Sequence, residues 1–209
     1  MKMGRIKKVL KKTKGFNRVV ILLTMSDVFT WGSYIIISLL TGIYLSERFG
    51  EDTVTLIGVG TAVYYITRAA FQIPVGLVTD KIKKDRDEIA ILFAGVILMG
   101  LPFIFYPQIT NSFQYYLLQF TFGLGASLNV TNWRKLFALN VDSGREGIQY
   151  AIYETILSFS VAAISILGGY IANISEEYFD AVMSVGGILI MLGSIWIILI
   201  YKYEDRVSK

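Results

Sequence analysis

The sequence contains no cysteine and no histidine among its 209 residues. Without cysteine there is neither a disulfide framework nor a thiol site. Without histidine the chain lacks the commonest metal ligand and general base, which excludes zinc chemistry and a serine–histidine relay. We therefore expect no metal centre, no cofactor and no enzymatic activity.

Charged residues are also scarce, at 17% of the chain, whereas hydrophobic residues reach 54%. A soluble domain of this length carries about a quarter charged residues. The apolar residues fall in six long blocks, and a helix needs roughly 20 residues to span the hydrocarbon of a bilayer. This pattern predicts an all-α integral membrane protein with a basic tail at 1–18, a six-helix domain at 19–201 and a short tail at 202–209. The expected spans are 19–45, 54–79, 89–106, 113–133, 148–174 and 181–201.

The basic residues are distributed unevenly over the connections between these spans. Of the 20 lysines and arginines, 18 lie in the N-terminal tail, the loop after span 2, the segment after span 4 and the C-terminal tail. Because lysine and arginine accumulate on the cytoplasmic side of a membrane, both termini are expected in the cytoplasm. We therefore interpret the net charge of +4 as a consequence of the orientation of the chain in the inner (plasma) membrane, and not as a sign of a nucleic-acid partner.

Three ionisable residues interrupt the apolar blocks: Asp27, Arg68 and Glu154. Each costs roughly 2.5 to 3.5 kcal/mol at the centre of a spanning helix, so such residues face a cavity or pair with one another. At 1.5 Å per residue, all three lie at a similar depth from the cytoplasmic ends of their helices. The alternative is an ion pair that only holds helices together.

Polar neighbours at helical spacing extend these three positions into polar faces, which favour a water-filled solute cavity over a purely structural ion pair. The further cavity candidates are Trp31, Tyr34, Tyr64, Tyr65, Gln72, Asn129, Asn132 and Tyr150. Tyrosine-rich faces suit sugars, amphipathic drugs or aromatic solutes, whereas the three charges suit an ionic solute or a coupling proton. The sequence does not decide between these classes of solute.

The loop that follows span 2 reads GLVTDKIKKDRDE over residues 76–88. It resembles the signature loop between the second and third helices of the major facilitator superfamily, although a lysine replaces the usual second glycine. The resemblance implies a gate at the cytoplasmic side, in which Asp80 would hold one face closed. The matching positions are Gly76, Asp80, Lys81, Lys84 and Arg86.

The fourth span contains QFTFGLGAS, similar to the fourth-helix pattern of the same family. Gly123 and Gly125 match that pattern, but Gln119 stands where many members have an arginine linked to proton transfer. An acid in the first span, here Asp27, recurs in proton-coupled members. The resemblance therefore leaves proton coupling open.

Members of this family usually have twelve helices in two parallel halves, each built from two inverted three-helix repeats. This sequence provides six spans, so the resemblance implies a half-size transporter. We expect a parallel homodimer that moves a small solute, with or without protons, through the lipid bilayer by alternating access. Two alternatives stay open: a six-helix half that pairs with a different half, and a membrane scaffold or sensor that transports nothing.

Overall fold

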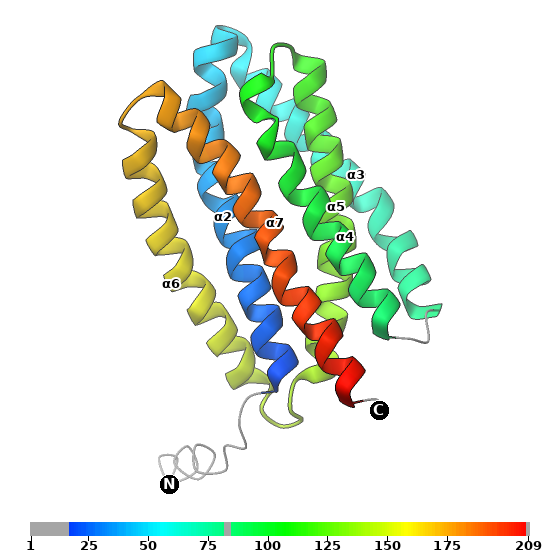
Figure 1. Cartoon of the computed structure of the whole chain (residues 1–209). Coiled ribbons are helices and arrows are strands. Elements are labelled where there is room, and N and C mark those ends of the chain that lie inside the picture. Colours follow the sequence, from blue (N-terminus) through cyan, green and yellow to red (C-terminus); the bar gives the residue numbers. More distant parts are fainter. Residues whose placement is uncertain (1–16, 82–84, 208–209) are drawn as a thin grey trace, which may run out of the picture.

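The computed structural model describes residues 17–81 and 85–207, with side chains for 17–81 and 87–202. These residues form six long α-helices that run alternately up and down, so that both described ends lie at the same end of the bundle (Figure 1). The helices are α2 (Arg18–Phe49), α3 (Thr53–Lys81), α4 (Asp85–Ile104), α5 (Ser112–Asn140), α6 (Glu146–Ala172) and α7 (Glu176–Val207). Short 3₁₀ turns, η1 (Gly50–Asp52) and η2 (Tyr106–Gln108), lie at the opposite end.

Each apolar block of the sequence lies on one of these helices, and the expected all-α class is confirmed. Side chains at two helix starts accept hydrogen bonds from backbone N–H groups that the helix leaves free. Asn17 accepts from Val19 N–H at 2.9 Å, and Asn111 accepts from Gln114 N–H at 3.0 Å. The helices also run beyond the apolar blocks, most clearly α5, which continues past residue 133 to Asn140.

Four stretches of the described residues are long and apolar enough to cross a membrane. They are Arg18–Lys81, which contains both α2 and α3, and then Asp87–Ile104, Glu146–Ala172 and Glu176–Lys202. Helix α5 is not among them, since glutamine, asparagine, serine and threonine interrupt its apolar residues. Six membrane spans therefore stay a prediction.

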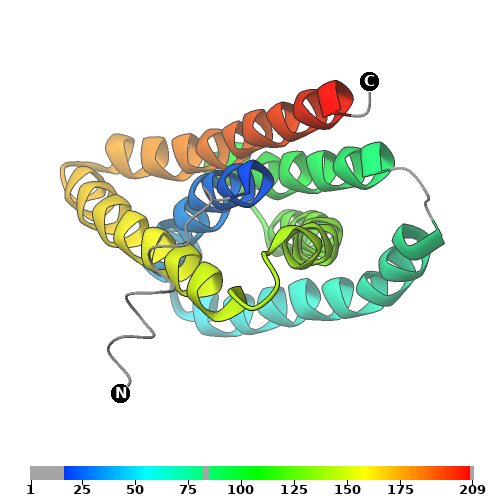
Figure 2. The ribbon, with the colours of Figure 1, turned by 90° about the horizontal axis from the view of Figure 1, so that it is seen from below.

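The six helices pack in three layers, which are visible when the bundle is viewed along its axis (Figure 2). Helices α4 and α7 pack against each other on one side, α2 and α5 lie in the middle, and α3 and α6 lie on the other side. Helix α2 contacts α7 and α6, whereas α5 contacts α4 and α3. The two middle helices are thus enclosed by protein on two sides, which suits their polar residues.

Glycines allow the closest helix crossings in the bundle. A Cβ atom at Gly100 of α4 would lie 2.5 Å from the carbonyl oxygen of Gly187 of α7. A Cβ atom at Gly125 of α5 would lie 2.7 Å from the backbone nitrogen of Met99 of α4. Since these neighbours are backbone atoms, no side-chain movement can make room for a Cβ atom. Helix α4 can therefore approach α5 and α7 this closely only because glycines stand at these positions.

Arg48, at the end of α2, connects several segments at the end of the bundle opposite the described termini. Its guanidinium forms an ion pair with Asp180 of α7 at 2.9 Å and donates to the carbonyl oxygen of Pro107 at 2.9 Å. The same guanidinium lies 4.6 Å from the ring centre of Tyr44, whose hydroxyl donates to Asp180. These contacts connect α2, α7 and the α4–α5 connection.

Candidate functional site

The site begins at Asp27, in the third turn of α2, where only 3% of the residue is exposed. The hydroxyl of Tyr153 in α6 donates a hydrogen bond of 2.7 Å to Oδ2 of this carboxyl group. The other oxygen, Oδ1, is buried and accepts no hydrogen bond from the described residues. A buried carboxyl oxygen without a partner is costly, which makes Asp27 a candidate for contact with a ligand.

A cavity of about 350 Å³ adjoins Asp27. Its wall comes from α2, α3, α5 and α6, so four helices meet around it. Small-molecule sites typically occupy about 300 to 1,000 Å³, which places this cavity at the small end of that range. The lining residues are Asp27, Trp31, Ile35, Arg68, Asn129, Val130, Trp133, Arg134, Tyr153 and Leu157.

Two hydrogen bonds connect the middle helices α2 and α5 beside this cavity. The indole nitrogen of Trp31 donates to Oδ1 of Asn129 at 3.3 Å, and that of Trp133 donates to the carbonyl oxygen of Leu23 at 3.1 Å. Because an indole N–H can only donate, the first bond fixes which side of the Asn129 amide carries oxygen. Its amide nitrogen, Nδ2, is buried and has no partner among the described residues.

Arg68 of α3 supplies a positive charge to the same cavity. One of its guanidinium nitrogens donates to the hydroxyl of Tyr64, one turn earlier, at 3.1 Å. Among the described residues, no ion pair joins Arg68 to Asp27 or Glu154. The guanidinium therefore keeps most of its donors available to the cavity.

Aromatic rings close the bundle beyond the cavity, towards the end opposite the termini. Tyr34 and Tyr64 each stack on Phe122 of α5, with ring centres 4.6 and 5.0 Å apart. Trp31 meets the edge of Tyr34 at 5.6 Å. Tyr34 and Tyr64, two of the tyrosines expected as cavity residues, thus belong to an aromatic layer, and Trp31 connects this layer to the cavity wall.

The structure places the other expected cavity residues outside the cavity lining. Glu154 is exposed and lies with Thr155, Ser158 and Phe159 along a shallow depression on α6. Asn132 accepts from Thr79 of α3 at 3.1 Å and donates to its own helix at 2.7 Å. The remaining three are Tyr65, which is exposed, Gln72, which is partly buried, and Tyr150, which packs against Phe137.

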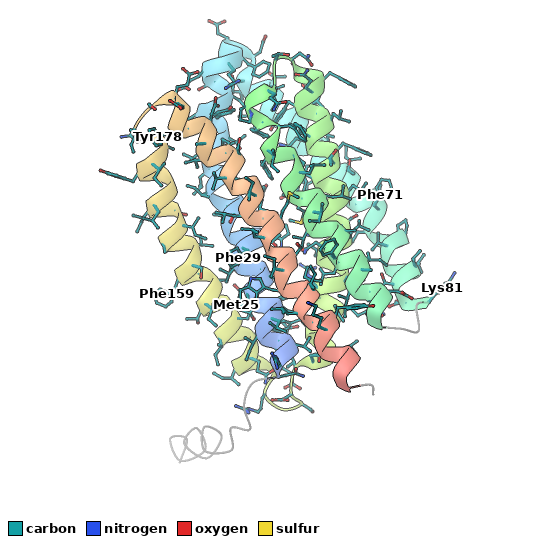
Figure 3. The ribbon with its side chains drawn as sticks, viewed as in Figure 1. Met25, Phe29, Phe71, Lys81, Phe159 and Tyr178 are labelled. Atoms are coloured by element: carbon teal, nitrogen blue, oxygen red, sulfur yellow. The ribbon has the colours of Figure 1, made fainter. Side chains whose placement is uncertain are left out.

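Lys135 of α5 joins the end of α3 to the start of α4 at the signature loop. Nζ of Lys135 lies 2.8 Å from Oε1 of Glu88, 3.1 Å from the carbonyl oxygen of Thr79 and 3.3 Å from Oδ1 of Asp80. A Cβ atom at Gly76 would meet its neighbour at 3.8 Å, an ordinary contact. Among the other motif residues, Lys81 ends α3 and points away from the bundle (Figure 3), Lys84 lies outside the described residues, and the side chain of Arg86 does too.

Sequence reasoning missed four residues that shape this region: Tyr153, Trp133, Arg134 and Lys135. Tyr153 gave no signal because a single tyrosine in an apolar block is common, and the charge of the next residue drew the prediction to Glu154. A helix turns about 100° per residue, so these two neighbours point in different directions. The three α5 residues follow one another in the sequence: Trp133 is the last residue of the expected span 113–133, and Arg134 and Lys135 are interpretable from the sequence only as a sign of orientation.

Comparison with known proteins decides the family. The family model of the Major Facilitator Superfamily matches residues 22–209, which is most of the chain. The chain belongs to the Major Facilitator Superfamily. No curated protein and no solved structure matches the chain.

Membership of the Major Facilitator Superfamily confirms the resemblance drawn from residues 76–88 and from the glycines of α5. Together with its long apolar helices, it makes the chain a multi-pass membrane protein of a transporter family. At 209 residues the chain is consistent with a half-size member of this superfamily.

Proposed function

We propose that the chain is one half of a secondary-active transporter that moves a small solute by alternating access as a parallel homodimer. The observation that carries this proposal is the cavity at Asp27. It combines a buried acid, an arginine with free donors and aromatic walls between the two middle helices. A purely structural ion pair would instead bring the opposite charges into contact.

The outer faces of α3 and α6 support a partner of similar shape. They carry many of the large exposed hydrophobic side chains, among them Phe159, which is 75% exposed and points away from the bundle (Figure 3). Beside it, Glu154, Thr155 and Ser158 form a polar stripe on α6. A carboxyl group facing lipid costs roughly 2.5 to 3.5 kcal/mol, so we infer that protein covers this stripe.

The helix packing supports two inverted three-helix repeats. Exchanging α2 with α5, α3 with α6 and α4 with α7 turns the α4–α5 contact into the α7–α2 contact. The same exchange turns the α3–α5 contact into the α6–α2 contact and leaves the α4–α7 contact in place. Corresponding helices also run in opposite directions (Figure 1), as repeats of inverted topology require.

The charges at the two ends support cytoplasmic termini in the inner membrane. In the sequence, 18 of the 20 basic residues fall in the two tails and in the connections after the second and fourth spans, whereas Arg48 is the one base in the other connections. That opposite end carries several acids from the η1 turn and the start of α7. Because this bias is strong, two copies insert in the same orientation, which permits a parallel dimer.

The mass of the purified chain in nanodiscs tests the dimer. Native mass spectrometry should give twice 23.5 kDa, which is 47 kDa. Two copies joined in tandem between their neighbouring termini should give the same mass as a single polypeptide. A 23.5 kDa species, or a stable complex with a different six-helix protein, would refute the homodimer in favour of a heterologous half.

Proton coupling is tested at Asp27 by an asparagine substitution in the reconstituted dimer. If Asp27 carries the coupling proton, a pH gradient should no longer drive uptake, because asparagine cannot titrate. Exchange of solute across the membrane should persist. Full gradient-driven uptake by the Asp27→Asn dimer would exclude Asp27 as the coupling site. A dimer with the correct mass that moves no solute in any assay would favour a scaffold or sensor.

A further inference from the structure

Two buried polar groups in the cavity wall lack a hydrogen-bond partner among the described residues. They are Oδ1 of Asp27, which can accept, and Nδ2 of Asn129, which can donate. The two residues are 3% and 1% exposed, and both line the cavity. A buried group without a partner costs about 1 to 3 kcal/mol, so a ligand that satisfies both groups gains affinity.

The hydrogen bonds around the cavity determine which of these two groups can act as a donor and which as an acceptor. The hydroxyl of Tyr153 already occupies the second oxygen of Asp27, and the indole of Trp31 occupies the oxygen of Asn129. The hydrogen-bonding capacity left at these two lining residues is therefore a carboxyl oxygen in one case and an amide N–H in the other. The two cannot exchange roles without losing those bonds.

Arg68 adds further donors from α3, the helix that packs against the helix of Asn129. A guanidinium has five N–H groups, and Arg68 uses one nitrogen for the Tyr64 hydroxyl. Carboxylates match the geometry of a guanidinium and form its strongest hydrogen bonds. The cavity therefore calls for an anionic oxygen group at Arg68 and Asn129, and for a positively charged donor at Asp27.

We propose that the cavity binds a small zwitterion whose ammonium group meets Asp27 and whose carboxylate meets Asn129 and Arg68. This inference deepens the proposed transport function and rests on it. Trp31 and Trp133 also line the cavity and supply apolar surface that can cover the body of the ligand. A volume of about 350 Å³ is sufficient for a molecule of amino-acid size.

Other solute classes leave one of these groups without a partner. A sugar brings no charge to Asp27 or Arg68. An organic cation satisfies Asp27 but repels Arg68, whereas an organic anion satisfies Arg68 but repels Asp27. A site that requires both charges discriminates strongly, because the missing partner leaves a buried polar group unpaired.

The test uses the purified chain in nanodiscs and measures binding without any gradient. The probes are the amino acids with uncharged side chains, each compared with its amide, a cation, and its N-acetyl derivative, an anion. At least one amino acid should bind about tenfold tighter than both of its derivatives by calorimetry, the ratio expected when one hydrogen-bonded charge is lost.

Two substitutions assign the two ends of the ligand. Asp27→Asn turns the free acceptor into a donor, so the amino acid should lose its advantage over the N-acetyl derivative and keep it over the amide. Arg68→Gln should have the opposite effect. As charge controls, Asp52→Asn and Lys202→Gln alter exposed residues away from the cavity and should preserve both ratios.

Three results would overturn the inference: no amino acid binds, the derivatives bind equally well, or Asp27→Asn and Arg68→Gln each weaken all three ligand forms by the same factor. The last result would reveal a structural role. Because binding is measured without transport, the two proposals fail separately. An amino acid that binds but is never taken up would refute the transporter alone, whereas uptake of an uncharged solute would refute the zwitterion alone.

Discussion

Replacing Lys135 by methionine removes the ammonium group that joins α5 to the ends of α3 and α4. Methionine keeps an unbranched side chain, so packing along the stem changes little. The substitution leaves Glu88 without a cationic partner among the residues whose side chains the structure describes, and only 4% of the Glu88 side chain is exposed. Breaking a buried ion pair costs about 3 to 5 kcal/mol, whereas exposed pairs contribute up to about 1 kcal/mol. Because 27% of the Lys135 side chain is exposed, we expect a loss of about 2 to 3 kcal/mol.

Thermal unfolding in detergent, followed by the fluorescence of the three tryptophans, measures this loss. A chain of this size shifts its Tm by about 2 to 4 °C per kcal/mol, so the Lys135→Met variant should melt roughly 4 to 12 °C lower. Adding Glu88→Gln should restore much of the Tm, since the buried charge is then removed as well. Lys202→Met, which removes an exposed lysine, is the matched control.

The contribution of Lys135 also depends on pH with a definite sign. Lys135 lies beyond the apolar block of α5, and its hydrogen bond to Glu88 raises the pKa of Lys135 above the ordinary 10.5. A pKa raised in the folded state gives stability that is fully present below about pH 10.5 and is lost as the pH rises through the folded value. The Tm difference between wild type and Lys135→Met should therefore be constant at neutral pH and shrink in alkali.

Two outcomes would contradict this reasoning. The first is a Lys135→Met variant that melts with the Lys202→Met control. The second is a double variant whose loss equals the sum of the two single losses, because that would mean Glu88 and Lys135 do not interact. A Tm difference that stays unchanged through strongly alkaline pH would remove the electrostatic explanation alone.

Two further predictions concern packing and topology. Gly100→Ala should lower the Tm by several degrees, because the added Cβ would lie 2.5 Å from a backbone oxygen of α7 and overpacking costs about 1 to 3 kcal/mol. The control is Gly58→Ala, whose Cβ would meet nothing within 4 Å and should leave the Tm unchanged. Equal Tm values for the two variants would refute the close contact at Gly100. A single cysteine at Glu51 or Ser175 should react with an impermeant thiol reagent in intact cells, whereas one at Ser143 should not. The assay has no background because the chain contains no cysteine of its own. Labelling of Ser143→Cys would refute the predicted orientation.

That Asp27 lines a buried cavity could be predicted, because a charge within an apolar block has few explanations. Its partner could not be predicted. Tyr153 is 126 residues away in sequence, and a tyrosine in a membrane helix is common enough to carry no information by itself. Glu154 attracted the prediction because it is charged, yet its side chain faces away from the cavity lining. Depth along a helix follows from counting residues, but the direction of a side chain depends on how the helices pack.

The helices themselves followed directly from the apolar blocks, whereas the role of Lys135 did not. In the sequence it is one of 18 basic residues in the tails and connections expected on one side of the membrane, and that count is sufficient to predict an orientation. Its contacts with Glu88 and Asp80 exist because the ends of α3 and α4 both pack beside α5. Such a convergence of three segments leaves no periodic signal in any one of them.

The polar character of α5 also bears on how the protein is made. A segment that is too polar to be stable alone in lipid enters the membrane together with helices that shield its polar groups. The two helices that pack most closely on α5, α3 and α4, both precede it in the chain and are synthesised first. Substitutions that loosen the α4–α5 crossing at Gly125 should therefore leave α5 outside the bilayer during synthesis, so that the chain is degraded before any folded protein can be measured.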